Sequence, residues 1–363
     1  MKLFILSDEL SGNGPVWMNI FWPHYTAYSD SVPTTLMSTP RRQPKEGRLR
    51  MRWDDWHERR NHGDRLCDLV RRERDPGGPN VLLVWALNMR DIKRVRLLEP
   101  VWDMFDVKVL WVLDTVHPDD TRLELIRRFD LIASICGDIG QDFEAATGIP
   151  AIYMPPHTDV LRYGSVDDYR PLDLLVVGRR ESEIYSPVHF HFNEHKRRRL
   201  SIDLVTRTGN FSGTAEQECQ LLMGAYSRTK ISFCFEPSGS HPRFRGYSPL
   251  TERWPHSWAS GCTVVGTRPT GLGVAEQMDW PEATIEIPRS PDDAIAVIDA
   301  LLDDTAALRR RRLRNVAEAA RRHDSRHRLH TLLGKLDLPV PEELAVGLTR
   351  LETMANELFR EAA

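Results

Sequence analysis

The chain has 363 residues, more than one hydrophobic core usually organises, so we expect two domains. Hydrophobic residues make up 41% of it and charged residues 28%, the composition of an ordinary soluble protein. The formal net charge of -3 excludes a strong overall attraction to nucleic acid or to an anionic membrane, although basic clusters occur at 41–42 and 196–199.

The five cysteines are odd in number, widely spread and mostly in apolar surroundings. This distribution favours neither a disulfide framework nor a zinc ribbon, and we expect reduced core residues in a cytoplasmic protein. The sequence contains no apolar run of the roughly 18 residues that cross a bilayer. The apolar start at 1–6 ends at Ser7 and is too short for a signal sequence.

The first half of the chain opens with a strand at 2–6 and a loop that contains Gly12 and Gly14, followed by an aromatic segment with Trp17. We interpret residues 27–63, which are polar and interrupted by prolines, as an extended insertion or acceptor-side loop. Helices and strands then alternate, as a parallel sheet requires. The expected strands are 80–86, 107–113, 131–134 and 151–154, and the expected helices are 64–73, 91–102, 118–129 and 137–147.

The second half begins with a buried-type strand at 172–177, followed directly by Gly178, Arg179 and Arg180. Alternation continues to the end of the chain, which predicts a second doubly wound sheet. The expected strands are 202–206, 231–235, 262–265 and 284–287, and the expected helices are 193–199, 215–227, 271–278, 291–302, 305–337 and 341–361. We expect the arginine run 309–314 to be a solvated helix face.

The segment 229–267 reads as a strand, a charged turn, a helix and a second strand. In such a parallel βαβ unit, ligands bind beyond the carboxyl ends of the strands and at helix amino termini. Glu236 ends the first strand, and Thr251, Glu252 and Arg253 begin the helix. The pattern therefore predicts a ligand site formed by these four residues.

This segment resembles the nucleotide-sugar site of GT-B glycosyltransferases, which has FxFE, a Ser/Gly-rich loop, a T-E-R triplet and then A-S-G-C-T-V-V. The resemblance implies that Glu252 holds the ribose hydroxyls of the nucleotide and that Arg253 contacts the diphosphate. The chemistry agrees, because a carboxylate accepts hydroxyl protons and a guanidinium offers a planar fork of donors to phosphate oxygens.

A second stretch, LIASICGDIGQDFEAATGIPAIYMPPHTD at 131–159, resembles the end of the amino-terminal domain of the same enzymes. The implied fold is α/β, with two Rossmann-like doubly wound parallel sheets facing a central cleft. We expect an acceptor-binding domain at 1–162, a nucleotide-sugar-binding domain at 163–340, and a helix at 341–363 that crosses back to the first domain. The resemblance extends to V-G-R at 177–179, where Gly178 would admit the donor diphosphate and Arg179 or Arg180 would neutralise it.

The catalytic candidates are Asp114, His117 and Glu236. A general base must remove a proton from the acceptor hydroxyl, and the turn after the predicted strand 107–113 would face the cleft of this fold. The alternatives are a structural turn histidine at 117 and a strand-end carboxylate at 236. Equally, Glu252 and Arg253 could be an ordinary first helical turn, and Arg179 and Arg180 a solvated loop.

The sequence departs from retaining GT-B enzymes, many of which carry two glutamates separated by seven residues. His256 stands at the position of the second glutamate, and Ser248 lies eight residues earlier. The arrangement is closer to the fucosyltransferase-like version of the site, and the stereochemistry stays open.

We therefore expect a glycosyltransferase that moves a sugar from a nucleotide-diphosphate donor to a hydroxyl acceptor, a saccharide or small natural product, with Gly12, Gly14 and Trp17 on the acceptor side. We expect no cofactor and no metal, because no D-x-D element occurs in a suitable loop. Nucleic acid is not the expected partner. The alternatives are a catalytically silent nucleotide- or sugar-binding protein and a sugar-nucleotide epimerase or phosphorylase on the same scaffold. A nucleic-acid-modifying transferase is a further variant.

Overall fold

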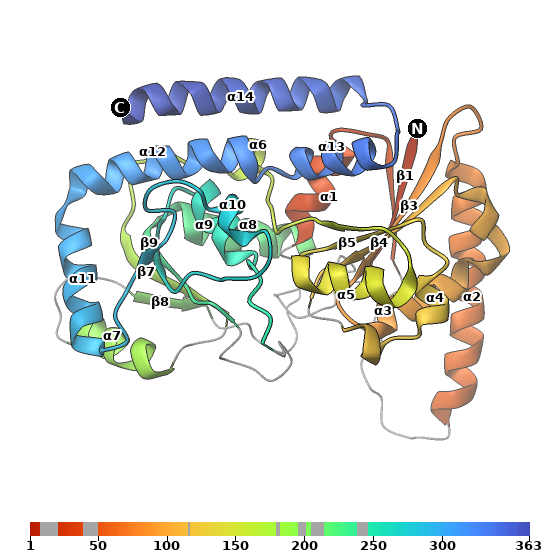
Figure 1. Cartoon of the computed structure of the whole chain (residues 1–363), viewed down its shortest axis with the longest axis horizontal. Coiled ribbons are helices and arrows are strands. Elements are labelled where there is room, and N and C mark those ends of the chain that lie inside the picture. Colours follow the sequence, from red (N-terminus) through yellow and green to blue (C-terminus); the bar gives the residue numbers. More distant parts are fainter. Residues whose placement is uncertain are drawn as a thin grey trace. The chain divides into compact units, whose positions relative to one another are not determined.

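The computed structural model describes the chain outside residues 8–20, 39–49, 115–116, 179–181, 195–200, 205–213 and 238–245. Gly12, Gly14, Trp17, Arg179 and Arg180 lie outside the described residues. The chain forms two compact units, drawn in Figure 1. The first comprises Met1–Gly14 and Val32–Met154, and the second comprises Pro15–Ser31 and Pro155–Ala363.

The first unit is built on a parallel sheet that has six strands in the described part of the chain. Every residue of β3 is buried, and Trp85 on β3 packs edge-to-face against Trp111 on β4 with ring centroids 5.6 Å apart. Such unbroken apolar strands are typical of parallel sheets covered on both faces. The strand order is β2 (Thr34–Met37), β1 (Lys2–Leu6), β3 (Asn80–Ala86), β4 (Val107–Val112), β5 (Leu131–Ser134) and β6 (Ala151–Tyr153).

The helices that precede β5 in the chain differ from the expected ones: the expected helix 91–102 is largely 3₁₀, and the expected helix 118–129 is two short helical segments at 118–120 and 123–126. The prediction of an irregular loop at 27–63 is wrong, because this stretch contains the end of helix α1 (Trp22–Ser29), strand β2 and the first half of α2 (Arg50–Glu73). The start of α2 is rich in charged residues, so it lacks the apolar periodicity that marks a helix. The other helices are α3 (Met89–Lys93), the 3₁₀ helices η2 (Arg94–Met104) and η3 (Pro118–Asp120), α4 (Leu123–Ile126) and α5 (Gly137–Thr147).

The second unit is built on another all-parallel sheet, with five strands among the described residues. Leu174 packs with the helices α7 and α11, whereas its neighbour Leu175 packs with α8, so helices cover both faces. This confirms the doubly wound α/β architecture. The strand order is β11 (Ile285–Glu286), β10 (Thr263–Gly266), β9 (Thr229–Cys234), β7 (Leu172–Val177) and β8 (Ser201–Leu204). The covering helices are α7 (Ser182–Glu194), α8 (Ala215–Ser227), α9 (Arg253–Ala259), α11 (Pro291–Asp303) and α12 (Thr305–Arg322).

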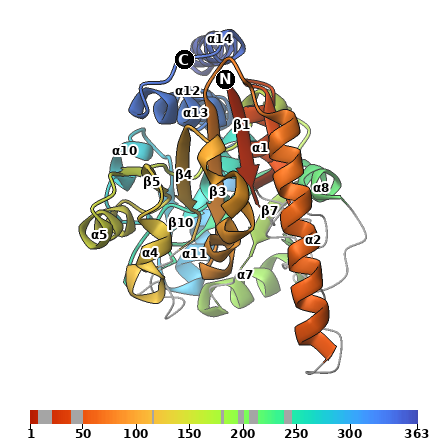
Figure 2. The same ribbon diagram turned by 90° about the vertical axis from the view of Figure 1, so that its right-hand side faces the viewer.

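The C-terminal helices form a layer of the second unit, and α14 (Glu342–Ala362) lies along α12 in Figures 1 and 2. The single helix expected at 305–337 is broken at Asp324, whose carboxylate caps α13 (Ser325–Lys335). Two short helices, α6 (Val160–Tyr163) and α10 (Val274–Gln277), complete the unit. The crossing of the last helix to the first domain stays a prediction. In the described part of the chain, every helix is too short or too polar to cross a membrane.

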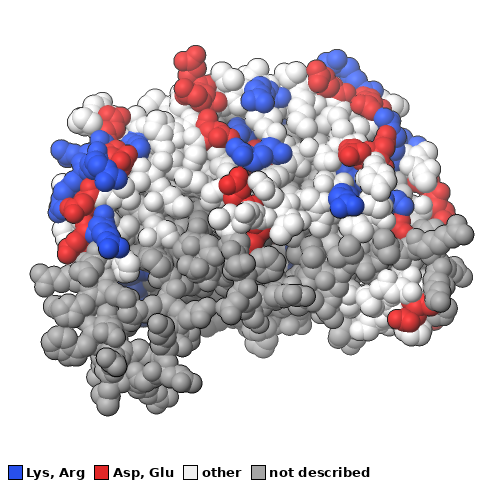
Figure 3. All heavy atoms as spheres, turned by 180° about the vertical axis from the view of Figure 1, so that it is seen from behind, with Lys and Arg blue, Asp and Glu red and all other residues white. Residues whose placement is uncertain are grey.

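Charges of both signs are interspersed over the described part of the face shown in Figure 3. The arginine run of α12 is paired with acidic side chains, for example Arg309 with Glu361 and Arg311 with Glu282. Arg312 is buried and contacts Asp168, so the expected solvated face is wrong at this position.

Helix α1 belongs to the second unit although it precedes β2 in the sequence. It packs against α8 and α13, and its side chains form hydrogen bonds with residues 157 and 159. Pro23 at the start of α1 is favourable there because its missing N–H would lack a helical partner anyway. A segment expected in the first domain therefore supplies side chains to the second unit.

Candidate active site

The carboxyl ends of β9 and β10 lie close together in the second unit. Gly266 ends β10 with φ 150°, and a Cβ atom there would lie 1.9 Å from the carbonyl oxygen of Cys234. Only glycine permits this approach. Just beyond it, the Thr267 hydroxyl accepts a hydrogen bond of 3.0 Å from the backbone N–H of half-buried Glu236.

Arg253 is fixed at the same sheet edge from the first turn of α9. Its Nη2 donates to the carbonyl oxygen of Phe235 at 3.0 Å, and its Nε donates to Oγ1 of Thr251 at 3.4 Å. The structure thus brings Thr251 and Arg253 to the strand end that carries Glu236. The Arg253 guanidinium is half-buried, and Nη1 has no hydrogen-bond partner among the described residues.

Gly178 follows β7, the strand that pairs with β9. Its φ is +84°, and a Cβ atom at this position would meet no atom of the described residues within 4 Å. Glycine is therefore favoured here by the left-handed backbone and not by a lack of space.

Glu252, unlike Arg253, has a buried side chain. The residue is 8% exposed, and Oε1 lies 3.2 Å from Nε2 of His24 on α1. Oε2 is buried and has no hydrogen-bond partner in the described part of the chain. Burial raises the pKa of Glu252 to about 8, so its carboxyl is mostly protonated at neutral pH.

His24 is fully buried and lies between two further groups. Its Nδ1 is 3.4 Å from Oγ of Ser325, the first residue of α13, and its ring stacks on that of His157 with centroids 3.8 Å apart. Burial, reinforced by the nearby charge of Arg328, lowers the pKa of His24 to about 3. The contact between His24 and Glu252 is therefore a hydrogen bond between neutral groups at neutral pH.

His256 lies one helical turn after Glu252 on α9, and its backbone N–H donates to the Glu252 carbonyl at 3.2 Å. Both ring nitrogens are buried without a hydrogen-bond partner among the residues described. Burial lowers the pKa of His256 to about 4, so the ring is neutral at physiological pH. Buried polar atoms are usually paired, so orphaned atoms on Glu252 and His256 mark this place for a water molecule or a ligand hydroxyl.

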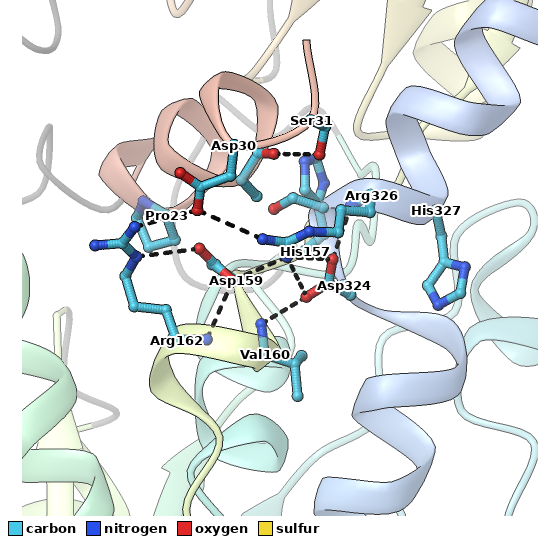
Figure 4. Close-up of polar contacts among 12 residues, drawn as sticks. Pro23, Asp30, Ser31, His157, Asp159, Val160, Arg162, Asp324, Arg326 and His327 are labelled. Atoms are coloured by element: carbon cyan, nitrogen blue, oxygen red, sulfur yellow. Dashed lines mark hydrogen bonds and ion pairs between the residues drawn. The ribbon is translucent and has the colours of Figure 1, made fainter. Parts of the chain in front are cut away.

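A buried ionic cluster supports the same region, and Figure 4 shows its contacts. Arg326 Nη1 lies 3.0 Å from Asp159 Oδ1 and 3.1 Å from Asp324 Oδ1. The backbone N–H of Val160 donates to Asp324 at 2.7 Å, and Thr26 of α1 donates to Asp159 at 3.2 Å. Burial raises the pKa values of both Asp159 and Asp324, and each is held by the shared guanidinium. The cluster fixes α1, the chain near 159 and the start of α13 to one another.

The sequence did not single out His24, His157 or Ser325. A histidine among the apolar residues of FWPHYTAYS, after a proline that starts a helix, was the available signal for His24. The Asp-Ser pair at 324–325 is a helix-start signal that would have revealed α13. Their proximity to Glu252 could not be read from the sequence, because 228 residues separate positions 24 and 252.

His117 and Asp114 lie in the first unit, after β4. His117 Nδ1 accepts a hydrogen bond from the backbone N–H of Asp119 at 3.2 Å, and Nε2 lies 3.8 Å from Oδ2 of Asp142. His117 caps the short helix η3, which is the structural role weighed as the alternative. Asp114 is half-buried. Among the described residues, no group of three His, Cys, Asp or Glu side chains is arranged to hold a metal ion.

Comparison with known proteins gives matches in structure but none in sequence: no family model and no curated protein matches the chain. An alpha-glucosyltransferase solved with UDP and a 13-mer DNA containing a HMU base has a TM-score of 0.56 at 11% identity, over 93% of this chain and 99% of that one. HepE of Anabaena, solved with UDP and glucose, has a TM-score of 0.54 at 11% identity over the same shares. The chain has the GT-B fold.

The GT-B fold also occurs in a structure of a different activity. A UDP-N-acetylglucosamine 2-epimerase has a TM-score of 0.51 at 8% identity, over 94% of this chain and 99% of that chain. Identities this low establish the fold and leave the reaction to be argued from the site.

Proposed function

We propose that the protein is a glycosyltransferase that moves a sugar from a nucleotide-diphosphate donor to a hydroxyl acceptor. The observation that carries the proposal is that Arg253, held at the carboxyl end of β9, follows directly after the buried Glu252 in a chain with the GT-B fold. Ligands of open parallel sheets bind at this edge.

The proposed donor site uses two neighbouring residues for two parts of the nucleotide. Glu252 offers Oε2 to a ribose hydroxyl, because Oε1 is already engaged by His24. Arg253 faces the diphosphate, and its contact with the Phe235 carbonyl pre-orients the guanidinium, so less side-chain freedom is lost on binding. In the transfer step the guanidinium would offset the negative charge that develops on the leaving diphosphate.

Glu236, Thr251 and Gly178 have supporting roles in this proposal. Thr251 holds Nε of Arg253, and the backbone at Gly178 would admit a phosphate oxygen, since no atom of the residues that the structure describes lies within 4 Å of its Cβ position. Glu236 stays a candidate for contact with the transferred sugar. The bases Arg179 and Arg180, which follow Gly178, are proposed partners of the diphosphate.

The acceptor hydroxyl needs a general base, and His117 is the proposed one, with Asp114 as the second candidate. In this role His117 would take the proton at Nε2, which lies 3.8 Å from Oδ2 of Asp142. Gly12, Gly14 and Trp17 are proposed acceptor contacts. The acceptor is a saccharide or a small natural product in this proposal, and a DNA duplex belongs in the acceptor panel as the alternative.

The test is a product assay with a panel of nucleotide-diphosphate sugars and hydroxyl acceptors, read by mass spectrometry. The proposal expects one donor to yield a glycosylated acceptor and free nucleoside diphosphate. Arg253→Ala should release the diphosphate far more slowly, whereas a substitution of the remote Arg309 should not change the rate. Failure of every donor and acceptor pair, with a folded protein that binds nucleotide, would favour a catalytically silent binding protein.

An epimerase is the second candidate, since the fold is shared with a sugar-nucleotide epimerase. Incubation with the donor alone separates the two, because an epimerase converts the sugar without an acceptor. A phosphorylase would instead need inorganic phosphate for turnover.

Metal independence is part of the proposal. In this fold, basic side chains can take the place of a divalent cation at the leaving group. Turnover is expected to be the same in EDTA and in magnesium. A rate that requires the added cation would contradict this part of the proposal and leave the transfer itself intact.

A further inference from the structure

His24 makes the only side-chain hydrogen bond of Glu252 within the described residues. The bond reaches Oε1 at 3.2 Å, while Oε2, equally buried, has no such partner. The carboxyl group is thus held by His24 at Oε1 and faced by the backbone N–H of His157, while Oε2 makes no hydrogen bond of ordinary geometry within the described residues. This asymmetry indicates that one oxygen serves orientation and the other serves a ligand.

Several contacts on different sides of the ring fix the position of His24. Ser325 Oγ lies 3.4 Å from Nδ1, and the ring stacks on His157, which in turn lies 3.3 Å from the Tyr28 hydroxyl. Helix α1 is itself attached by the bond from Thr26 to Asp159 and by the ion pairs of Asp30 with Arg162 and Arg326. Because these contacts hold the His24 ring in one orientation, they also hold Oε1 of Glu252, which the ring contacts.

The hydrogen bond between Oε1 of Glu252 and His24 determines whether Oε2 acts as a donor or as an acceptor. A neutral carboxylic acid whose Oε1–H donates a hydrogen bond to His24 Nε2 keeps Oε2 as a carbonyl-type acceptor. The imidazole then carries its own hydrogen on Nδ1 and donates it to Ser325 Oγ. An acceptor oriented in this way is suited to receive one hydroxyl hydrogen.

We propose that His24 is a positioning residue for substrate recognition: it fixes Glu252 through Oε1 so that Oε2 receives a ribose hydroxyl of the nucleotide. This inference rests on the proposed function, because it assumes a nucleotide at the second unit. It adds a residue of α1, outside the motif that resembles GT-B enzymes, to the recognition of the donor.

Two substitutions of His24 form a matched pair. His24→Gln places an amide near the position of Nε2 and can keep the contact with Glu252. His24→Asn places the amide near Nδ1, so it can keep the contact with Ser325 but not the one with Glu252. Tyr28→Phe is the control for general loosening, because it removes the hydroxyl that contacts His157 and leaves both nitrogens of His24 untouched.

The measurement is calorimetric titration of each protein with the ribonucleoside diphosphate that binds the wild type best, and with its 2′-deoxy and 3′-deoxy analogues. The wild type is expected to prefer the ribonucleotide over one analogue by about tenfold, the value of one good hydrogen bond. The ratio should persist in His24→Gln and Tyr28→Phe and fall toward one in His24→Asn. A purely structural role would lower all affinities together and leave the ratio unchanged.

The possible results distinguish a failure of the role of His24 from a failure of the proposed function. A wild type that binds no nucleotide overturns the proposed function, and the inference with it. A wild type that binds ribonucleotides and deoxynucleotides equally overturns the hydroxyl contact of Glu252. A wild-type preference that survives in His24→Asn, or one that is lost equally in both His24 variants, overturns the role of His24 alone.

Discussion

At the scale of single residues, the candidate site depends on a buried carboxyl and a half-buried guanidinium next to each other in the chain. Burial keeps Glu252 neutral, whereas the guanidinium of Arg253 reaches the strand end and donates to the carbonyl oxygen of Phe235. Neighbouring residues in the first turn of α9 thus acquire different chemistry from their environments. A neutral hydrogen-bonding group suits hydroxyls, and a fixed cation suits phosphate.

The raised pKa of Glu252 predicts a pH-dependent cost in stability. Between pH 4.5 and about 8 the unfolded protein has released this proton and the folded protein retains it, so stability falls as pH rises. Glu252→Gln has no proton to lose. We expect the stability of Glu252→Gln relative to the wild type to increase from pH 5 to pH 8, by up to roughly 1.4 kcal/mol per pH unit.

Urea unfolding of both proteins at several pH values measures this difference. The groups that face Glu252 are His24 on α1, His256 on α9, Arg328 on α13 and the backbone N–H of His157. They are present in both proteins, so their own titration largely cancels in the comparison. A stability difference that is flat across the pH range would mean that Glu252 is ionised in the folded protein.

Arg253 is expected to bind the diphosphate and not the nucleoside. Arg253→Ala should weaken the binding of a nucleoside diphosphate by roughly tenfold to a hundredfold, as for a hydrogen bond to a charged group, and leave the affinity for the nucleoside unchanged. Arg253→Lys keeps the charge but not the planar fork, so it should restore only part of the affinity. Equal diphosphate affinity in the wild type and Arg253→Ala would remove this residue from the site.

The sequence could predict Thr251, Glu252 and Arg253 as neighbours at a strand end, because the βαβ pattern is local. It could not predict that Glu252 would be buried against His24, because that contact joins helices from distant parts of the chain. The burial, and with it the raised pKa, follows from tertiary packing. The predictions for Arg179, Arg180, Gly12, Gly14 and Trp17 remain predictions.

At the scale of elements, the connection between α12 and α13 contains Asp324, which makes hydrogen bonds beyond the one that caps α13. Asp324 caps α13 and also accepts from the Val160 N–H and from Arg326, all within the buried cluster of Figure 4. Asp304 caps α12 through the Ala307 N–H alone and is exposed. The two aspartates share one local role and differ in their surroundings.

The two caps give a matched pair of substitutions. Asp304→Ala is expected to lower the free energy of unfolding by about 1 kcal/mol, the usual value of a cap. Asp324→Ala leaves part of the Arg326 charge uncompensated in a buried site and should lower it by about 3–5 kcal/mol. Chemical denaturation at pH 7 compares them, and similar losses would show that the cluster adds nothing to the cap.

Elements with a strong apolar signal could be predicted from the sequence. The strands 2–6, 80–86, 131–134 and 172–177 are confirmed, because continuous buried strands need apolar side chains on both faces. The strand β2 and the first half of α2 could not be predicted, since a short edge strand and a charge-rich helix lack that signal. The break at Asp324 was missed because helical patterns continue on both sides of it.

At the scale of the whole molecule, the GT-B fold was predictable from two motifs although no family model and no curated protein matches the sequence. The fold alone cannot decide the reaction, since structures of this fold include transferases and an epimerase. A transferase and an epimerase would both need a site that binds a sugar nucleotide. The acceptor side decides among them, and its candidate residues at 12, 14 and 17 lie outside the described residues.

The proposed function requires that Glu252 and Arg253 bind a nucleotide-diphosphate sugar. Thermal denaturation measures this binding when the wild type and the Glu252→Ala, Arg253→Ala double variant are each heated with a panel of nucleoside diphosphates and their sugars. A ligand at a hundred times its dissociation constant stabilises the folded state by about 2.7 kcal/mol, which raises the melting temperature by several degrees. We expect such a rise for at least one nucleotide in the wild type and none in the double variant. An absent rise in the wild type, or an equal rise in both proteins, would show that these two residues do not bind the nucleotide.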